Sequence, residues 1–143
     1  MSSTTFFFED ISTFELDQDF AGRQIKQLIN EEKKETGDIS VIFCSDRYLL
    51  EMNKKHLNHD YFTDIITFNY VEDDVISGDL FISADRIREN AGKFNVTFHE
   101  ELYRVILHGI LHLVGYNDKT SEEKKVMKDK ENYYLGKIEF GVD

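Results

Sequence analysis

The sequence predicts an α+β fold, a small mixed β-sheet of about four strands packed by helices around a central apolar helix. Short β-branched or aromatic runs bounded by turn residues indicate the strands, and two of these runs are joined by a short acidic turn. Longer stretches with apolar residues three or four positions apart indicate amphipathic helices. One stretch near residue 110 is apolar almost all round, which is typical of a helix in the core.

The first part of the chain alternates strand and helix. Residues 5–8 are an apolar run suited to an edge strand, and residues 39–44 are a β-branched run suited to a buried strand. Between them, residues 17–36 carry apolar side chains at helical spacing, and Gly37 is expected to stop that helix.

The middle of the chain predicts a helix and then a hairpin. Asp46 can cap a helix that runs to about Leu57, with its apolar residues facing inward: Leu49, Leu50 and Met52. Residues 64–70 and 76–83 are strand-like and are separated by an acidic turn, Glu-Asp-Asp. Because this connection is so short, the two strands should pair antiparallel.

The last part of the chain predicts consecutive helices, each preceded by a polar residue that can cap it. They cover residues 83–95, 97–114 and 120–135. Thr97 with Glu100 three residues later forms a capping box for the middle helix. Gly115 ends that helix, since glycine tolerates a left-handed turn.

Length and composition indicate one domain over residues 1–143, with enough chain to bury a core. The charge balance is acidic, 17 Lys and Arg against 28 Asp and Glu, for a net charge of −11. Such a surface repels polyphosphate at long range, which argues against nonspecific nucleic-acid binding. No run suits a signal peptide or a bilayer span, so the expected location is the cytoplasm, without a membrane partner. The lone Cys44 is expected to be a small buried hydrophobe rather than a reactive thiol.

Two histidines on the predicted core helix indicate a metal site. His108 and His112 are four residues apart, so their imidazoles project from one face about one turn apart. That spacing lets both nitrogens bind one ion at about 2.0–2.1 Å. Asp118 can fold back as a third ligand and leave a fourth tetrahedral position for water, as in catalytic zinc sites. The alternative is a pair of satisfied core histidines, which need two separate sets of partners.

Gly109 lies between the two histidines and bears on the mechanism. Glycine inside a helix costs about 1 kcal/mol relative to alanine, so a reason for it is expected. It either keeps a side chain away from the approach to the metal or allows close packing of the helix on a strand. In the zinc proteases the motif His-Glu-x-x-His places a general base at this position. The sequence therefore gives little support to a peptidase mechanism, while the metal site is unaffected.

Three segments carry a recognisable pattern. Residues 108–118 read His-Gly-Ile-Leu-His-Leu-Val-Gly-Tyr-Asn-Asp, residues 63–68 read Thr-Asp-Ile-Ile-Thr-Phe, and residues 78–83 read Gly-Asp-Leu-Phe-Ile-Ser. They resemble the signatures of the YbeY family of bacterial metal-dependent endoribonucleases: His-Gly-x-Leu-His-Leu-x-Gly-Tyr-Asp-His, Thr-Asp-Val-Leu-Ser-Phe and Gly-Asp-Ile-x-Ile-Ser. The resemblance covers nearly the whole chain. It implies a small mixed sheet packed by helices, zinc-dependent cleavage of single-stranded RNA, and a role in small-subunit rRNA maturation and ribosome quality control.

The chain departs from the family pattern at two places. The family's third metal-binding histidine falls on Asp118, with Asn117 where the family has aspartate. A carboxylate oxygen still binds zinc, and the harder ligand makes other divalent ions more plausible. An arginine that the family has before the Thr-Asp strand, associated with its RNA function, falls on Leu57.

The working hypothesis is hydrolysis of an RNA phosphodiester by zinc-activated water, with rRNA and the small ribosomal subunit as partners. Arg104, one turn before His108, is expected to stabilise phosphate charge, and a surface ion pair is its alternative role. Four other cations are candidate contacts to the RNA backbone, or are simply solvated: Lys54, Lys55, Arg86 and Arg88.

Two rival functions fit the sequence. A ribosome-biogenesis binding factor with a mainly structural metal is favoured by the missing arginine and the acidic surface, whereas the open coordination position argues against it. A metal hydrolase of a small molecule suits the negative charge better than RNA does. Stability after chelation separates the binding factor from the nuclease. A cleavage assay on rRNA with defined metal content separates the small-molecule hydrolase from it.

Overall fold

The computed structural model describes residues 3–57 and 63–138, apart from the Leu57 side chain, and these residues contain one mixed sheet of four strands. The strands are β1 (Thr4–Phe8), β2 (Glu35–Cys44), β3 (Ile65–Asn69) and β4 (Val75–Ser83). Their order across the sheet is β1-β2-β4-β3, with β1, β2 and β4 parallel and β3 antiparallel to β4. The predicted edge strand and the predicted hairpin are therefore confirmed.

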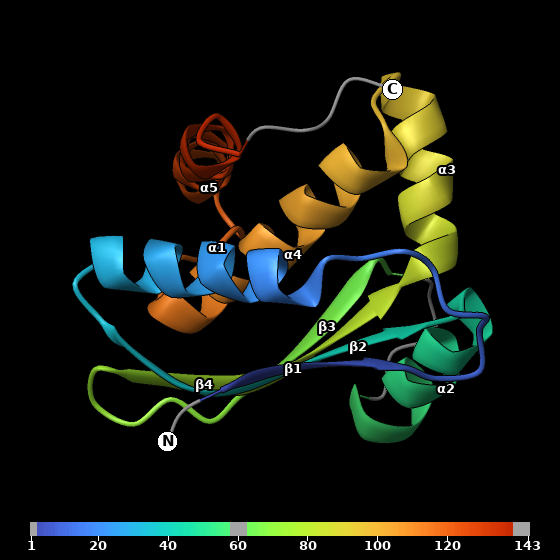
Figure 1. The fold of residues 1–143 in the computed structure, drawn as a ribbon, viewed down its shortest axis with the longest axis horizontal. Helices are drawn as coiled ribbons and strands as arrows, with labels where there is room; N and C mark the ends of the chain where they lie inside the picture. Colours follow the sequence, from blue (N-terminus) through green and yellow to red (C-terminus); the bar gives the residue numbers. More distant parts are fainter. Residues whose placement is uncertain (1–2, 58–62, 139–143) are drawn as a thin grey trace.

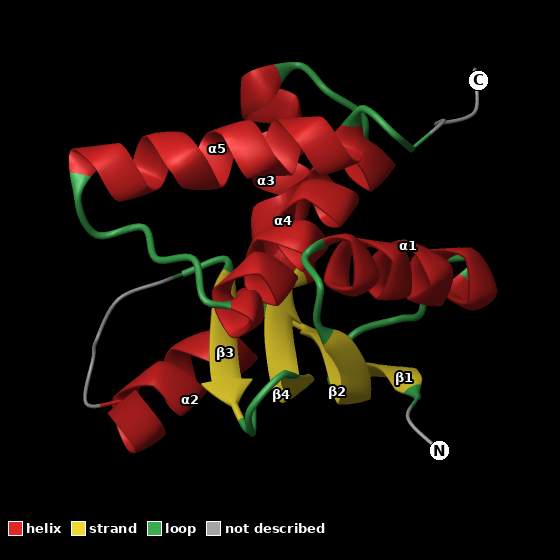
Figure 2. Cartoon of the chain, turned by 90° about the vertical axis from the view of Figure 1, so that its left-hand side faces the viewer, coloured by secondary structure: helices red, strands yellow, loops and turns green. Residues whose placement is uncertain are grey.

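Helices cover both faces of this sheet, which confirms the predicted α+β class. The helices α1 (Gln18–Glu31) and α4 (Phe98–Val114) pack on one face, and α2 (Asp46–Leu57) packs on the other (Figure 1). Directly after β4, α3 (Ala84–Phe94) begins and packs against α4. The last helix, α5 (Ser121–Leu135), lies across α4 on the side away from the sheet (Figure 2).

The main hydrophobic core lies between the sheet and α4, and its residues explain why α4 is apolar almost all round. Ile106, Ile110 and Leu111 of α4 are each 0% exposed, as is Leu80 of β4. A helix enclosed by a sheet, by α1 and by α5 has only a narrow polar stripe, and both histidines lie on it. A smaller cluster under α2 contains Cys44, which is 0% exposed. Burial raises the pKa of the Cys44 thiol to about 12, so the expected buried, inert cysteine is confirmed.

Two predicted boundaries are wrong. The first helix ends at Glu31, before the predicted Thr36, because the chain reverses at Lys33 (φ 63°) and enters β2. Gly37 therefore belongs to β2, at a register shift, where a Cβ would lie 2.1 Å from the Ser77 hydroxyl oxygen. At α2, the cap is Ser45, whose hydroxyl accepts a hydrogen bond from the Tyr48 amide at 3.1 Å.

Other predictions about helix ends and faces are confirmed. The Thr97 hydroxyl accepts from the Glu100 amide at 3.1 Å and begins α4, which confirms the Thr97 half of the predicted capping box. Thr120 with Glu123 forms a complete capping box on α5. In α2, Leu49 is fully buried, while Leu50 and Met52 are buried in part. No described helix combines the length and apolarity needed to cross a membrane.

Candidate metal centre

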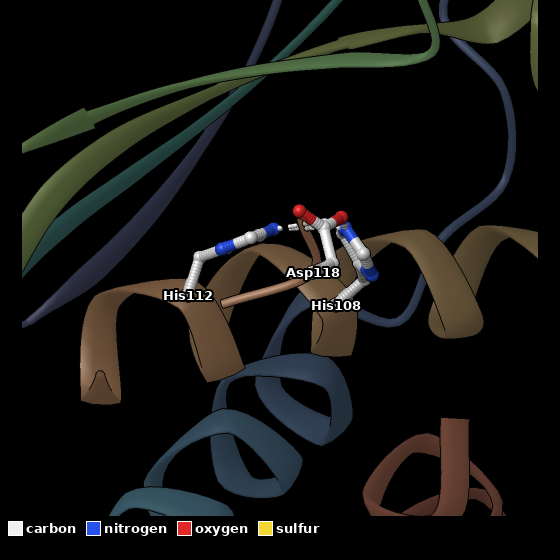
Figure 3. A group of neighbouring side chains, drawn as sticks. All are labelled: His108, His112 and Asp118. Carbon is white, nitrogen blue, oxygen red and sulfur yellow. Dashed lines mark hydrogen bonds and ion pairs between the residues drawn. The ribbon is translucent and has the colours of Figure 1, made fainter. Parts of the chain in front are cut away.

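The side chains of His108, His112 and Asp118 converge at the polar stripe of α4 (Figure 3). One ligand atom from each lies within 4.8 Å of the others. The two imidazole Nε2 atoms are 3.1 Å apart, and Asp118 Oδ2 lies 3.4 Å from His108 Nε2 and 3.3 Å from His112 Nε2. These side chains are partly exposed, at 19%, 26% and 40%, so the group opens to solvent.

These separations suit a four-coordinate ion. Ligand atoms that bind zinc tetrahedrally at about 2.0–2.1 Å stand roughly 3.3 Å apart at the tetrahedral angle. The three observed separations, 3.1, 3.3 and 3.4 Å, lie close to that value without rearrangement. Two imidazole nitrogens and one carboxylate oxygen are also a donor set that zinc accepts, so the residues present fit the group.

Asp118 is brought to the histidines by the turn that ends α4. Gly115 has φ 127°, which L side chains rarely adopt, and its amide donates to the Leu111 carbonyl at 3.1 Å. The Tyr116 hydroxyl then donates to Glu32 Oε1 at 2.6 Å, which fixes the loop against the end of α1. The capping box at Thr120 holds the other end of the loop. Asp118 therefore lies on a short connection that is fixed on both sides.

A network of buried charged side chains contacts His108 on the Nδ1 side of its imidazole, away from the metal-binding nitrogen. Glu131 of α5 is 5% exposed, and its Oε2 lies 2.5 Å from His108 Nδ1. With Nδ1 donating to this carboxylate, His108 directs the lone pair of Nε2 toward Asp118 and His112. The other oxygen of Glu131 accepts from Arg104 Nη1 at 3.1 Å, and Arg104 also pairs with Glu101, which is 2% exposed.

Arg104 thus lies beside the site but directs three of its nitrogens at carboxylates. Its Nε and Nη2 both donate to Glu101, and its Nη1 donates to Glu131. The hydrogen bonds to Glu101 raise the pKa of Arg104, against the effect of burial. The bidentate pair with Glu101 and the single bond to Glu131 place one positive charge between two carboxylates, so Arg104 forms ion pairs, as its alternative role predicted, but with buried rather than surface partners. A contact of Arg104 with phosphate stays a prediction.

The His108 proton is also stabilised by its surroundings. Burial acts to lower the pKa of His108, and the hydrogen bond with Glu131 and the charges of Glu131, Asp64 and Asp118 outweigh it, so the pKa is raised. A metal ligand must be deprotonated, so the same carboxylates that orient the imidazole make protons compete with an ion.

Two clefts open beside the metal-binding group and share His108 and Asp118. The first, of about 410 Å³, lies toward β3 and is lined also by Thr63, Asp64 and His112. Burial raises the pKa of Asp64, and the charges of His108 and Arg104 oppose the shift. Asp64 stands in the Thr-Asp segment noted in the sequence, where its role could not be predicted. The second cleft, of about 540 Å³, runs along α4 toward the end of α3 and is flanked by α5.

Gly109 packs against the sheet, which is the second of the two reasons expected for it. A Cβ there would lie 2.7 Å from Ile65 Cδ1 and 3.0 Å from both methyl carbons of Leu80. The missing side chain therefore lets α4 approach β3 and β4 closely. That approach brings the histidines next to the β3 residues of the smaller cleft.

The four predicted RNA contacts lie away from the histidines. Lys54 and Lys55 are in the last turn of α2, on the far face of the sheet. Arg86 Nε donates to Asp46 Oδ1 at 3.2 Å, and Arg88 Nη1 lies 3.9 Å from Asp85. None of the four is among the described residues that line the two clefts, so their contacts with RNA stay predictions.

The fold and the site define an α+β protein with a group suited to one metal ion on its central helix. A model of the family described as "Endoribonuclease YbeY" matches residues 8–139, and the chain belongs to this family. The resemblance that the sequence motifs indicated is thus confirmed.

Relatives named "Endoribonuclease YbeY" match over most of their length. One from Parabacteroides distasonis is 50% identical over 130 residues, which are 91% of this chain and 92% of the relative. One from Azobacteroides pseudotrichonymphae is 55% identical over 116 residues, or 81% of this chain and 84% of the relative. The solution structure of TM1509 from Thermotoga maritima has a TM-score of 0.66 and 28% identity, covering 94% of this chain and 87% of that one.

Proposed function

We propose that this protein is a metal-dependent endoribonuclease that cleaves single-stranded RNA in small-subunit rRNA maturation and ribosome quality control. Residues 1–143 form its single hydrolase domain, zinc is its ion, and it works in the cytoplasm. Family membership supports the endoribonuclease activity. The observation that carries the metal-dependent part is the convergence of His108, His112 and Asp118 at the junction of two open clefts. The oxygen ligand leaves other divalent ions as alternatives to zinc.

His108 and His112 would hold the ion through Nε2, and Asp118 through a carboxylate oxygen. When bound, such an ion supplies a Lewis acid beside the scissile phosphate and lowers the pKa of a water toward 7. Glu131 keeps the proton of His108 on Nδ1, so that Nε2 stays free to bind. His108 and Asp118 line both clefts and His112 lines the smaller one, so an RNA strand can reach the site from either cleft.

Asp64 is the group to which we assign removal of the proton from the attacking water. It lines the same cleft as both histidines, approaching from β3 across from α4. The glutamate that performs this role in the zinc proteases is absent from α4, where Gly109 stands in its place. Burial raises the pKa of Asp64 in the metal-free protein, and a raised pKa makes a carboxylate a stronger base.

Asp64→Asn tests that role. The variant should keep its metal and lose roughly 10²–10⁴-fold in kcat, because a positioned general base contributes about that much. Metal content and steady-state cleavage are measured on the same preparations. An Asp64→Asn protein that cleaves at the wild-type rate removes Asp64 from the mechanism and leaves the metal site standing.

The whole proposal is tested by cleavage of a single-stranded fragment of small-subunit rRNA at defined metal content. His112→Ala and Asp118→Ala should lose both the ion and the cleavage. His99→Gln is the matched control, since His99 is exposed and its one hydrogen bond among the described residues is from Nε2 to the Glu15 carbonyl (2.9 Å). Leu57→Arg, which restores the family's arginine, should not reduce activity. Full cleavage by metal-free protein contradicts the proposal.

A further inference from the structure

The larger of the two clefts extends well beyond the metal-binding group. We call it the α5 groove, and it is the cleft of about 540 Å³ between α5 and the α3–α4 turn. Its floor is the face of α4 that carries Glu101, Arg104 and His108. At a rise of 1.5 Å per residue, the seven steps along α4 from Glu101 to His108 span about 10 Å. The groove therefore offers room for a nucleotide next to one whose phosphate lies at the histidines.

Two lysines of α5 give this groove a charge unlike that of the rest of the surface. Lys124 and Lys128 line it, are exposed, and form no ion pair with the other residues that the structure describes. Glu101 and Glu131 also line the groove, but each is paired with Arg104. The lining thus contains three cations against three carboxylates, on a chain with a net charge of −11. An ion at the histidines would make it positive.

The end of the groove away from His108 is apolar. Phe94, the last residue of α3, is 53% exposed, and Val96 of the α3–α4 turn is 37% exposed. Met127 of α5, which is 2% exposed, also lines the groove. An aromatic ring open to solvent beside unpaired cations is the combination that binds single-stranded nucleic acid, because bases stack on rings and phosphates pair with lysine.

We infer that the α5 groove is a nucleotide subsite, in which the base stacks on Phe94 and the adjoining phosphate contacts Lys124 and Lys128. This inference rests on the proposed function and names the part of the RNA that the site recognises beyond the scissile phosphate. Stacking does not depend on which base is present, so the subsite selects for an unpaired nucleotide rather than for a sequence. It also explains how an acidic protein admits RNA, since the charges that line the groove balance one another while the chain as a whole is acidic.

Steady-state cleavage of a single-stranded oligonucleotide by the metal-loaded protein tests the subsite. Phe94→Ala should raise KM about tenfold, the loss expected for one stacked base, with kcat within about twofold of the wild type. A substrate that lacks one base at the nucleotide bound in the groove should show the same rise in KM with the wild type. The two losses should not add, because each removes the same contact.

The lysines are tested through the salt dependence of binding, followed by fluorescence anisotropy before cleavage is appreciable. The double variant Lys124→Gln, Lys128→Gln should lower the slope of log affinity against log salt by about 0.7, since the two lysines share one phosphate and each single-strand phosphate contact contributes about 0.7. Lys125→Gln is the matched control, because Lys125 is exposed on the same helix and does not line the groove.

Phe7→Ala controls for loss of an exposed ring, because Phe7 is 44% exposed on the edge strand β1. Thermal unfolding of each variant checks that the fold is retained. A KM for Phe94→Ala no higher than for Phe7→Ala overturns the subsite, and so does a change confined to kcat. A wild type that binds RNA with these dependences but cleaves none contradicts the proposed function instead.

Discussion

Glu131→Gln is the substitution that tests how the buried charges behind the metal site act. Glu131 accepts from His108 Nδ1 at 2.5 Å and from Arg104 Nη1 at 3.1 Å, and it is 5% exposed. Glutamine keeps the volume but has one accepting oxygen, so its NH2 group must face one of the two donors. The variant therefore leaves either His108 or Arg104 without an acceptor on this side.

The size of the effect follows from these two bonds. Loss of a carboxylate behind a metal-binding histidine typically costs 10–100-fold in metal affinity, or about 1.4–2.8 kcal/mol. A buried donor left without its partner costs about 1–3 kcal/mol of folding free energy. Arg104 retains its two bonds to Glu101, so the fold should survive. We therefore expect a folded, less stable protein with metal affinity reduced 10–100-fold.

Competition with a chromophoric chelator at fixed pH measures that affinity, and urea unfolding of the metal-free protein measures stability. Asp129→Asn is the matched control, because it removes a like charge from an exposed position on the same helix. If Glu131→Gln binds the ion as tightly as Asp129→Asn does, Glu131 does not orient His108. A loss of stability alone would assign Glu131 only to the packing of α5.

Three further outcomes are expected. Gly78→Ala should lower the free energy of unfolding by about 1–3 kcal/mol, since its Cβ would lie 2.5 Å from the Phe68 carbonyl oxygen. Urea unfolding measures this loss, with Gly92→Ala as the control because a Cβ there meets nothing within 4 Å. Equal effects of the two substitutions would refute the prediction. The raised pKa of His108 stabilises the metal-free fold below its unfolded pKa of about 6.5, and this contribution is lost as the pH rises through the raised value. Metal affinity should weaken as the pH falls toward 5, because protons then compete with the ion for His108. Chelator competition that gives the same affinity from pH 5 to 8 would contradict this. Chelation should leave the circular dichroism spectrum of the protein unchanged, because the core is apolar and does not include the ligands; unfolding would mean that the metal is structural.

The elements that the sequence predicts well are those decided by short-range rules. The hairpin follows from two strand-like runs and an acidic turn, in which Asp73 takes φ 53°. Thr97 and Gly115 mark both ends of α4, and the spacing of His108 and His112 places both imidazoles on one stripe. Each of these predictions depends only on residues a few positions apart.

The parts that could not be predicted depend on partners distant in the sequence. Glu101 lies in the first turn of α4, where an acidic residue is explained by the helix dipole alone. Glu131 lies on a highly charged helix, 23 positions from His108. One signal was available, because Met127, Glu131 and Tyr134 share the buried stripe of α5 at helical spacing. Without the position of α5, the sequence leaves both phosphate stabilisation and a surface ion pair open for Arg104, and it does not identify Glu101 and Glu131 as the buried partners of this arginine.

The end of α1 shows the same limit. Residues 32–36 are all polar and include good helix formers, so they are compatible with a further helical turn, and Gly37 is a plausible stop. The chain leaves the helix earlier because the Glu35 amide donates to the Asp74 carbonyl at 2.8 Å and begins the pairing of β2 with β4. Strand pairing across 39 positions decides the boundary, and no local pattern records it.

Stepwise return of zinc to the metal-free protein, with RNA cleavage recorded against ions bound per chain, tests the central claim most directly. If His108, His112 and Asp118 hold the one ion that the reaction needs, cleavage should rise in proportion to zinc and level off at one ion per chain. Cleavage at full rate before any zinc is added, or a rate that stays at zero after one ion has bound, would contradict the account.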